Sequence, residues 1–271
     1  MSETKRMTVI IVILLILALA FFIISPAARK HPELDKLRGG FIAHRGLHSG
    51  SIPENSLAAF RAAAEKGYII ENDIHLTADG EVVVFHDDTL KRMCGVDAKV
   101  EEKTLAELKA LRLAGTDEQI PTLKECLDEV CGKVPMLIEF KANGNTSALC
   151  EAADKILAEY NGEYFVQSFY PQVLAWYKTH RPSIMRGQLA APFKGDKIER
   201  RLLGLMLFNS LSRPDFIAYE HVYGRHIMLR LMKLLGAATL GWTIRSQAEL
   251  NAAKPHFDGY IFENFEINSR R

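Results

Sequence analysis

YIIENDIHLTADGEVVVFHDD, residues 68–88, is the stretch of the chain that decides the fold. It holds two short β-rich runs, Tyr68–Ile74 and Val82–His86, that have the composition of strands. Too few residues separate them for a crossover helix, and Asp79-Gly80 between them is a strong turn signal. We therefore predict an antiparallel hairpin at this point of the chain.

The register of this hairpin would bring acidic and histidine side chains together. A turn centred on Asp79-Gly80 pairs Asp73 with His86, because the turn sets which residues lie opposite each other. Glu71 would lie two residues along on the same face as Asp73. The hairpin thus predicts two carboxylates beside a histidine.

Around the hairpin, short β-rich runs alternate with helical stretches, which is typical of a parallel α/β fold. The 271 residues also suit a (β/α)8 barrel, which takes about 250 residues. There are nine candidate strands, whereas a (β/α)8 barrel has eight, so we predict a TIM-type barrel that is distorted by an extra hairpin arm. The candidates are Phe41–His44, Tyr68–Ile74, Val82–His86, Met136–Lys141, Tyr164–Ser168, Ile184–Leu189, Asp215–Tyr219, Ala238–Ile244 and Gly259–Glu263.

Polar groups follow four of these strands, where an apolar core would not tolerate them. In a barrel the carboxyl ends of the strands share one face, so we expect these groups to converge there. They are His44-Arg45-Gly46, Glu71-x-Asp73, His86-Asp87 and Glu139-x-Lys141.

Three carboxylates in this set point to a metal. Glu71, Asp73 and Glu139 offer hard oxygen ligands of the kind that Mg²⁺ and Ca²⁺ prefer. Glu-x-Asp on a strand directs both acids to one side, and like charges held close need a cation. The alternative is a solvated strand edge.

Histidines and cations supply the rest of a hydrolytic site. His44 and His86 suit general acid and base work, since imidazole exchanges protons near neutral pH. Arg45 could bind phosphate oxygens in bidentate fashion, and Lys141 could bind them as a point charge.

The N-terminus carries an apolar segment. Residues 7–24, MTVIIVILLILALAFFII, hold no charge and just reach the length of about 20 residues that spans a bilayer. We predict a retained transmembrane helix, a single-pass anchor, with a cleaved signal peptide as the alternative. The predicted organisation is therefore a tail, helix and linker over residues 1–38 and a barrel domain over residues 39–271.

The membrane orientation stays open. Lys and Arg are fewer before the segment than after it, which favours a cytoplasmic catalytic domain. The residues concerned are Lys5 and Arg6 before it, and Arg29, Lys30, Lys36 and Arg38 after it.

Charge and cysteine content exclude other classes. A net charge of +1 gives no global field for binding nucleic acid. The cysteines lack zinc-knuckle spacing and are too few for a disulfide framework, so we expect buried or incidental thiols, with one structural bridge as the alternative. They are Cys94, Cys126, Cys131 and Cys150. Oligomeric state is not indicated.

Seven ordered motifs resemble the glycerophosphodiester phosphodiesterase family, and they cover nearly all of the chain after the linker. The first half carries most of the resemblance. The motifs are HRG at 44–46, PENS at 53–56, ENDIHLTADGEVVVFHDDTLKR at 71–92, IPTL at 120–123, IEFK at 138–141, QSF at 167–169 and GWTI at 241–244.

The resemblance implies a (β/α) barrel that hydrolyses glycerophosphodiesters to sn-glycerol 3-phosphate and an alcohol with a divalent cation. Matching positions then receive roles, from acid–base catalysis through metal and phosphate binding to a substrate pocket. They are His44 and His86 as the acid–base pair, Glu71, Asp73 and Glu139 as metal ligands, Glu54 as an extra ligand or a neighbour of the ligands, Arg45 and Lys141 on the phosphate, and Trp242 in the pocket.

The C-terminal half departs from the family pattern. Arg245 stands where the family usually has an asparagine, and Glu263-Asn264 stands where a Thr-Asp pair usually closes the last strand. We interpret these changes as affecting the specificity for the alcohol rather than catalysis.

A second departure is residues 194–213, KGDKIERRLLGLMLFNSLSR, which mix basic residues with a long apolar run. An ordinary barrel helix with one buried face is the first interpretation. The second is an interfacial segment that touches lipid near the cleft.

Several functions remain open at this level. A lysophospholipase D would use the same site on lysophospholipids, and the anchor favours it. A phospholipase C-like relative would cut the opposite phosphate ester bond. A membrane-tethered phosphate-binding module without catalysis is a further alternative, although such a module should have lost one of the candidate catalytic residues.

Overall fold

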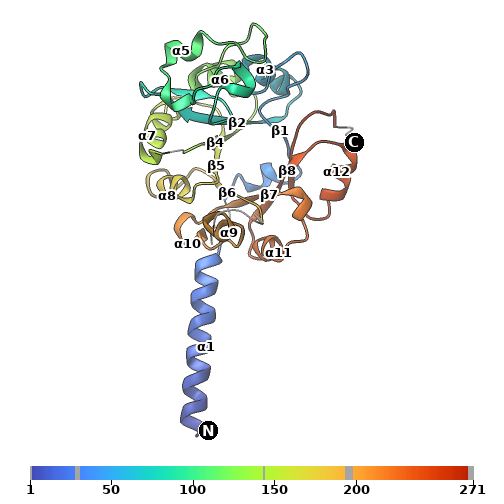
Figure 1. The fold of residues 1–271 in the computed structure, drawn as a ribbon. Coiled ribbons are helices and arrows are strands. Elements are labelled where there is room, and N and C mark those ends of the chain that lie inside the picture. The colour runs from blue at the N-terminus through green and yellow to red at the C-terminus, as the bar shows by residue number, and fades with distance from the viewer. Residues whose placement is uncertain (1, 28–30, 143, 193–197, 268–271) are drawn as a thin grey trace.

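The computed structural model describes residues 2–27, 31–142, 144–192 and 198–267. In this part of the chain, eight parallel strands close into a barrel in the order β1, β9, β8, β7, β6, β5, β4, β2, with β2 paired back to β1 (Figure 1). The predicted TIM-type barrel is confirmed, and each strand lies within two residues of its predicted bounds. The strands are β1 (Phe41–Ala43), β2 (Ile69–Leu76), β3 (Val82–Val84), β4 (Met136–Phe140), β5 (Tyr164–Ser168), β6 (Arg186–Ala190), β7 (Phe216–Glu220), β8 (Ala238–Ile244) and β9 (Gly259–Phe262).

Helices cover the outside of the barrel and pack on it through a continuous apolar core. Side-chain caps start several of them. Ser56 accepts a hydrogen bond from the Ala59 N–H at the start of α3, and Thr122 with Glu125 forms a capping box at the start of α6. The α-helices of the described residues are α1 (Glu3–Ile24), α2 (Leu34–Leu37), α3 (Leu57–Glu65), α4 (Lys91–Cys94), α5 (Leu105–Lys109), α6 (Leu123–Val130), α7 (Thr146–Leu157), α8 (Pro171–His180), α9 (Ile198–Gly204), α10 (Asn209–Ser212), α11 (Ile227–Leu234) and α12 (Gln247–Ala253), and two short 3-10 helices are η1 (Val100–Glu102) and η2 (His221–Tyr223).

The hairpin arm β3 pairs antiparallel with β2 outside the barrel, as predicted, but in another register. The N–H of Phe85 donates to the carbonyl of Asp73 at 2.9 Å, so Asp73 lies opposite Phe85 and the predicted pairing with His86 is wrong. The turn has three residues, 78–80, rather than two, and Gly80 takes the left-handed φ of 85° that such a turn requires. One extra turn residue is enough to shift the whole register.

The segment predicted as a polar linker, residues 25–38, contains the short helix α2. Leu34 and Leu37 are buried with the apolar side chains that fill the barrel interior, among them Ile42 and Phe216. Because α2 directly precedes β1, it closes the amino-terminal end of the barrel and leaves the carboxyl end for the site.

The apolar segment near the N-terminus forms α1, which stands away from the barrel as an isolated helix (Figure 1). It is long and apolar enough to cross a membrane, and none of its residues is buried. Its carboxyl end is held by the barrel: Asn209 donates to the carbonyl of Ile24 at 2.7 Å, and the Ala27 N–H donates to the carbonyl of Pro214 at 2.9 Å.

Residues 194–213 combine the two alternatives considered for them. Lys194 to Lys197 lie outside the described residues. In the remainder, Leu203 and Met206 are buried as in an ordinary barrel helix, whereas Leu205 and Leu207 are exposed.

The four cysteines are free thiols in this structure. Cys126 and Cys150 are buried, Cys94 is half-buried and Cys131 is exposed. The prediction of buried or incidental thiols is confirmed.

Candidate active site

Three carboxylates meet at the carboxyl end of the barrel. Glu71 and Asp73 lie on β2, and Glu139 lies directly beside Asp73 in the parallel register of β2 and β4. Each of the three offers one oxygen within 4.8 Å of the others, so the convergence predicted from the strand ends is confirmed. Strand pairing therefore places the cluster without any help from loops.

Burial makes this cluster electrostatically demanding. Glu71 and Asp73 are fully buried, and Glu139 is 6% exposed. Burial raises the pKa of Glu71 well above its ordinary value, and the charges of Asp73 and Glu139 raise it further. Burial also raises the pKa of Glu139, against the lowering effect of Lys141.

Lys141 offsets part of this negative charge. Its Nζ lies 2.5 Å from Oε1 of Glu139 and 3.0 Å from Oδ1 of Asp73. Burial would raise the pKa of Asp73, but Lys141, His86 and Arg45 outweigh burial and hold that pKa below its ordinary value. The ammonium group of Lys141 thus lies between Asp73 and Glu139, where it offsets part of their negative charge.

The turn after β1 brings backbone donors to the same acids. Arg45 takes a left-handed φ of 55°, and its N–H donates to Oε2 of Glu71 at 3.0 Å. Gly46 follows with a φ of 78°, and a Cβ at this position would lie 2.8 Å from Ala59. Only glycine fits this close approach of the turn to α3.

The Arg45 side chain links the acids to a neighbouring ion-pair network. Its NH1 donates to Glu54 at 2.7 Å, and its Nε lies 3.7 Å from Asp73. Glu54 also accepts from Arg92 at 2.5 Å. Glu54 is therefore held by two guanidinium groups and is not part of the acidic cluster; its role as an extra ligand stays a prediction.

The two predicted histidines flank the acids. His86 follows β3, and its Nδ1 lies 2.7 Å from Oδ1 of Asp87, which in turn accepts from Arg92. His44 follows β1, and its Nδ1 is hydrogen bonded to Oε2 of Glu263. In each case a carboxylate engages one ring nitrogen, which leaves Nε2 available for proton transfer.

His44 is the more enclosed of the two histidines. Its side chain is 12% exposed, against 30% for His86. Burial lowers the pKa of His44 to about 4, although the hydrogen bond to Glu263 acts in the opposite direction. His44 is therefore uncharged at neutral pH and can accept a proton.

Arg245 and Glu263, at which the C-terminal half departs from the family pattern, form a hydrogen-bonded chain with His44. Arg245 Nε donates to Oε1 of Glu263 at 2.8 Å, while the other oxygen of Glu263 engages His44. From the sequence we interpret these positions as affecting the specificity for the alcohol, yet Glu263 contacts a histidine of the candidate catalytic pair.

We expect the Glu263→Gln variant to lower kcat by about 10- to 100-fold with little change in KM, because a carboxylate behind a histidine orients the ring and favours its proton uptake. Steady-state kinetics over a range of pH would measure this. In the Arg245→Gln control the carboxylate stays in place, so the loss should be much smaller. An unchanged kcat in Glu263→Gln would show that Glu263 has no positioning role.

Two more polar residues support the acids and were not singled out from the sequence. Asn55, which is buried, donates through Nδ2 to Asp73 at 2.9 Å, and Gln167 on β5 lies 3.4 Å from Glu71. Both belong to quoted motifs, PENS and QSF, but their spacing alone does not show that they reach the acids.

A small cavity of about 170 Å³ joins these groups, and Trp242 lies on its wall with Phe169. The site residues that line it are His44, Arg45, Glu71, His86, Glu139, Lys141, Gln167 and Arg245.

A larger cavity of about 740 Å³ adjoins it and shares His86, Glu139, Lys141 and Phe169 with it. Leu203 and Phe208, from the segment beside α1, line this second cavity.

A TIM-type barrel with three buried carboxylates beside two histidines suits the hydrolysis of an ester, because a cation and two proton-transferring groups could act on the same bond. The chain matches the model of the glycerophosphoryl diester phosphodiesterase family over residues 44–254. The chain belongs to this family and is an enzyme of the phosphodiesterase class.

Individual relatives agree with this assignment. YhdW of Bacillus subtilis (strain 168) is 29% identical over 215 residues, which are 76% of this chain and 86% of that protein. Lysophospholipase D GDPD1 of Rattus norvegicus is 33% identical over 152 residues, 51% of this chain and 47% of the relative, so this chain spans about half of that protein. The structure of an Oleispira antarctica phosphodiesterase in complex with the product sn-glycerol-3-phosphate has a TM-score of 0.71 and 26% identity, and the match covers 85% of this chain and 94% of that one.

Proposed function

We propose that this protein hydrolyses glycerophosphodiesters to sn-glycerol 3-phosphate and an alcohol. The observation that carries the proposal is the buried cluster of Glu71, Asp73 and Glu139 between His44 and His86. The similar Oleispira enzyme has sn-glycerol-3-phosphate as its product, which supports the same product here.

Glu71, Asp73 and Glu139 would hold a divalent cation, Mg²⁺ or Ca²⁺. The donor set fits, because it consists of hard oxygens, contains no sulfur and is too strongly buried to keep three negative charges without compensation. When bound, such a cation supplies Lewis-acid stabilisation of the negative charge on the phosphate oxygens.

Arg45 and Lys141 would bind the phosphate. Both already lie beside the acids, Arg45 at 3.7 Å from Asp73 and Lys141 at 3.0 Å. Both cationic side chains line the small cavity, so they can reach a phosphate there and neutralise the charge on its non-bridging oxygens.

The histidines would divide the proton transfers between them. His44 is buried and uncharged at neutral pH, so it would take the proton from the attacking hydroxyl, either water or the glycerol hydroxyl of the substrate. If the glycerol hydroxyl attacks, a cyclic phosphate forms, and water then opens it to give glycerol 3-phosphate. His86 is more exposed and is oriented by Asp87, so it would give a proton to the departing alcohol. Each transfer removes a charge that would otherwise develop in the transition state.

A panel of substrates tests the proposal. We expect glycerophosphocholine to give glycerol 3-phosphate and choline in the presence of Mg²⁺ or Ca²⁺, and EDTA to abolish turnover reversibly. Product analysis by mass spectrometry reads the result. Release of a phosphorylated headgroup would instead indicate the opposite ester bond, and absence of turnover on every diester with metal present would refute the proposal.

A lysophospholipase D activity is the second candidate, and the larger cavity favours it. Its volume of about 740 Å³ next to the catalytic residues, with Phe169, Leu203 and Phe208 in the lining, provides room and apolar contacts for an acyl chain. A lysophospholipase D is among the relatives. The ratio of kcat/KM for lysophosphatidylcholine to that for glycerophosphocholine decides between the two activities.

The helix α1 would anchor the enzyme to a membrane. Its length of 22 residues, its apolar composition and the absence of buried residues along it support this. Extraction of the expressed protein by detergent but not by alkaline carbonate would agree with an anchor, and recovery of a soluble chain that begins near residue 28 would show a cleaved signal peptide.

A further inference from the structure

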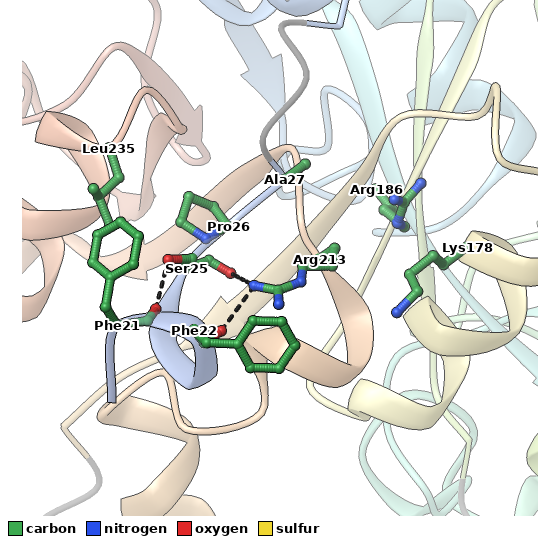
Figure 2. Close-up of a pocket in the computed structure, with 9 residues that line it drawn as sticks. All are labelled: Phe21, Phe22, Ser25, Pro26, Ala27, Lys178, Arg186, Arg213 and Leu235. Atoms are coloured by element: carbon green, nitrogen blue, oxygen red, sulfur yellow. Dashed lines mark hydrogen bonds between the residues drawn. The ribbon is translucent and has the colours of Figure 1, made fainter. Parts of the chain in front are cut away.

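The junction between α1 and the barrel contains a pocket of about 570 Å³ (Figure 2). It shares no lining residue with the cavity of the candidate catalytic groups. Its lining falls into an apolar part and a cationic part. The apolar part is Phe21, Phe22, Pro26 and Leu235, the cationic part is Lys178, Arg186 and Arg213, and Ser25 and Ala27 complete the wall.

Arg213 ties the cationic part of the pocket to the end of α1. Its NH1 donates to the carbonyl of Phe22 at 2.9 Å and to that of Ser25 at 2.8 Å (Figure 2). The guanidinium carbon also lies 4.3 Å from the centre of the Phe22 ring. The positive charge is therefore fixed at the level where the helix leaves the barrel.

The cations of this pocket repel one another. Among the described residues, no carboxylate lies within ion-pair distance of Lys178 or Arg213; Lys178 donates instead to the carbonyl of Leu211 at 2.7 Å. Arg186 has Asp215 at 3.8 Å. Burial lowers the pKa of Lys178, and the charges of Arg213 and Arg186 lower it further. A bound anion would relieve this repulsion.

The barrel surface between residues 198 and 234 is more apolar than the rest of the described barrel. Outside α1, the large hydrophobic side chains that are exposed in the described structure all lie between residues 198 and 234. Figure 1 shows α9, α10 and α11 of this region on the side of the barrel where α1 joins it. The exposed side chains are Ile198, Leu205, Leu207, Leu211, Val222, Ile227 and Leu234. This apolar collar points to contact with lipid rather than water.

We propose that the pocket binds the phosphate headgroup of an anionic phospholipid, with Lys178, Arg186 and Arg213 on the phosphate and the acyl chains along Phe21 and Phe22. The proposal rests on α1 spanning the membrane, which puts the carboxyl end of the helix at the depth of the headgroups. The catalytic residues take no part, so lipid binding and hydrolysis can be tested separately.

Native mass spectrometry of the full-length protein, released from nanodiscs of phosphatidylcholine with or without phosphatidylglycerol, tests the proposal. We expect one phosphatidylglycerol to be retained, and the thermal midpoint in detergent to rise when this lipid is added. Lys178→Gln, which keeps a donor for the Leu211 carbonyl but removes the charge, should weaken retention about fivefold, as expected for one basic residue at a membrane surface.

Two controls make the result specific. Lys155→Gln, the same change at an exposed lysine of α7, should bind phosphatidylglycerol like the wild type. Arg213→Gln should weaken binding at least as much as Lys178→Gln, while all variants keep their activity on glycerophosphocholine. The proposal would be overturned if the wild type and both pocket variants retained phosphatidylglycerol equally. It would also be overturned if inorganic phosphate alone raised the thermal midpoint as much as the lipid does, or if the protein were a dimer that carries no lipid.

Discussion

The Glu71→Gln variant is expected to lose activity by about 10³-fold, since a cation that contributes several kcal/mol to the transition state corresponds to about that factor. In metal-free buffer at pH 7 the same variant should unfold at a higher temperature than the wild type. Burial and two neighbouring acids raise the pKa of Glu71, so the wild type loses stability as the pH rises above 4.5, and a neutral isostere removes this loss.

Thermal unfolding in EDTA and in Mg²⁺ or Ca²⁺, alongside steady-state kinetics, measures both effects. The wild type should gain stability from the metal, and Glu71→Gln should not. Glu81→Gln is the matched control, because Glu81 is exposed on the same hairpin and away from the acids. An unchanged metal response in Glu71→Gln would remove Glu71 from the set of proposed ligands.

Replacing either histidine should lower kcat/KM by about 10²- to 10⁴-fold on glycerophosphocholine, the range that general acid–base catalysis contributes. The two variants should separate on a substrate with a good leaving group, such as glycerol 3-(4-nitrophenyl phosphate). His86→Ala should recover most of its activity there, because 4-nitrophenolate leaves without protonation. His44→Ala should not recover, because the attacking hydroxyl still needs a base.

Exposed His180 on α8 provides the control, and His180→Ala should match the wild type on both substrates. If His44→Ala rather than His86→Ala recovers with the nitrophenyl substrate, the roles of the two histidines are exchanged. Full activity of His44→Ala on glycerophosphocholine would contradict the mechanism even though the family assignment stands.

The sequence predicts the barrel and the acidic cluster well because both depend on local pattern. Successive side chains of a strand point to opposite faces, so Glu71 and Asp73 share a face of β2, and the carboxyl ends of parallel strands such as β2 and β4 meet at one edge of the sheet. Glu71, Asp73 and Glu139 could therefore be grouped without coordinates.

Interactions between distant loops could not be predicted in this way. The partnership of His44 with Glu263 joins residues from opposite ends of the barrel sequence, and it forms only because the closed sheet places β9 beside β1. The predicted register of the hairpin was wrong for a different reason, because turns of two residues and turns of three residues can both contain Asp-Gly.

The hydrogen bonds between the end of α1 and the barrel have a consequence for how the enzyme meets its substrate. Asn209, Arg213 and Pro214 hold the end of α1 directly on the barrel through hydrogen bonds. With α1 in a bilayer, the active site would stay at a fixed distance from the membrane surface while the protein diffuses laterally. For a lipid substrate, the rate then depends on the number of molecules per unit area of membrane rather than on their concentration in the surrounding water.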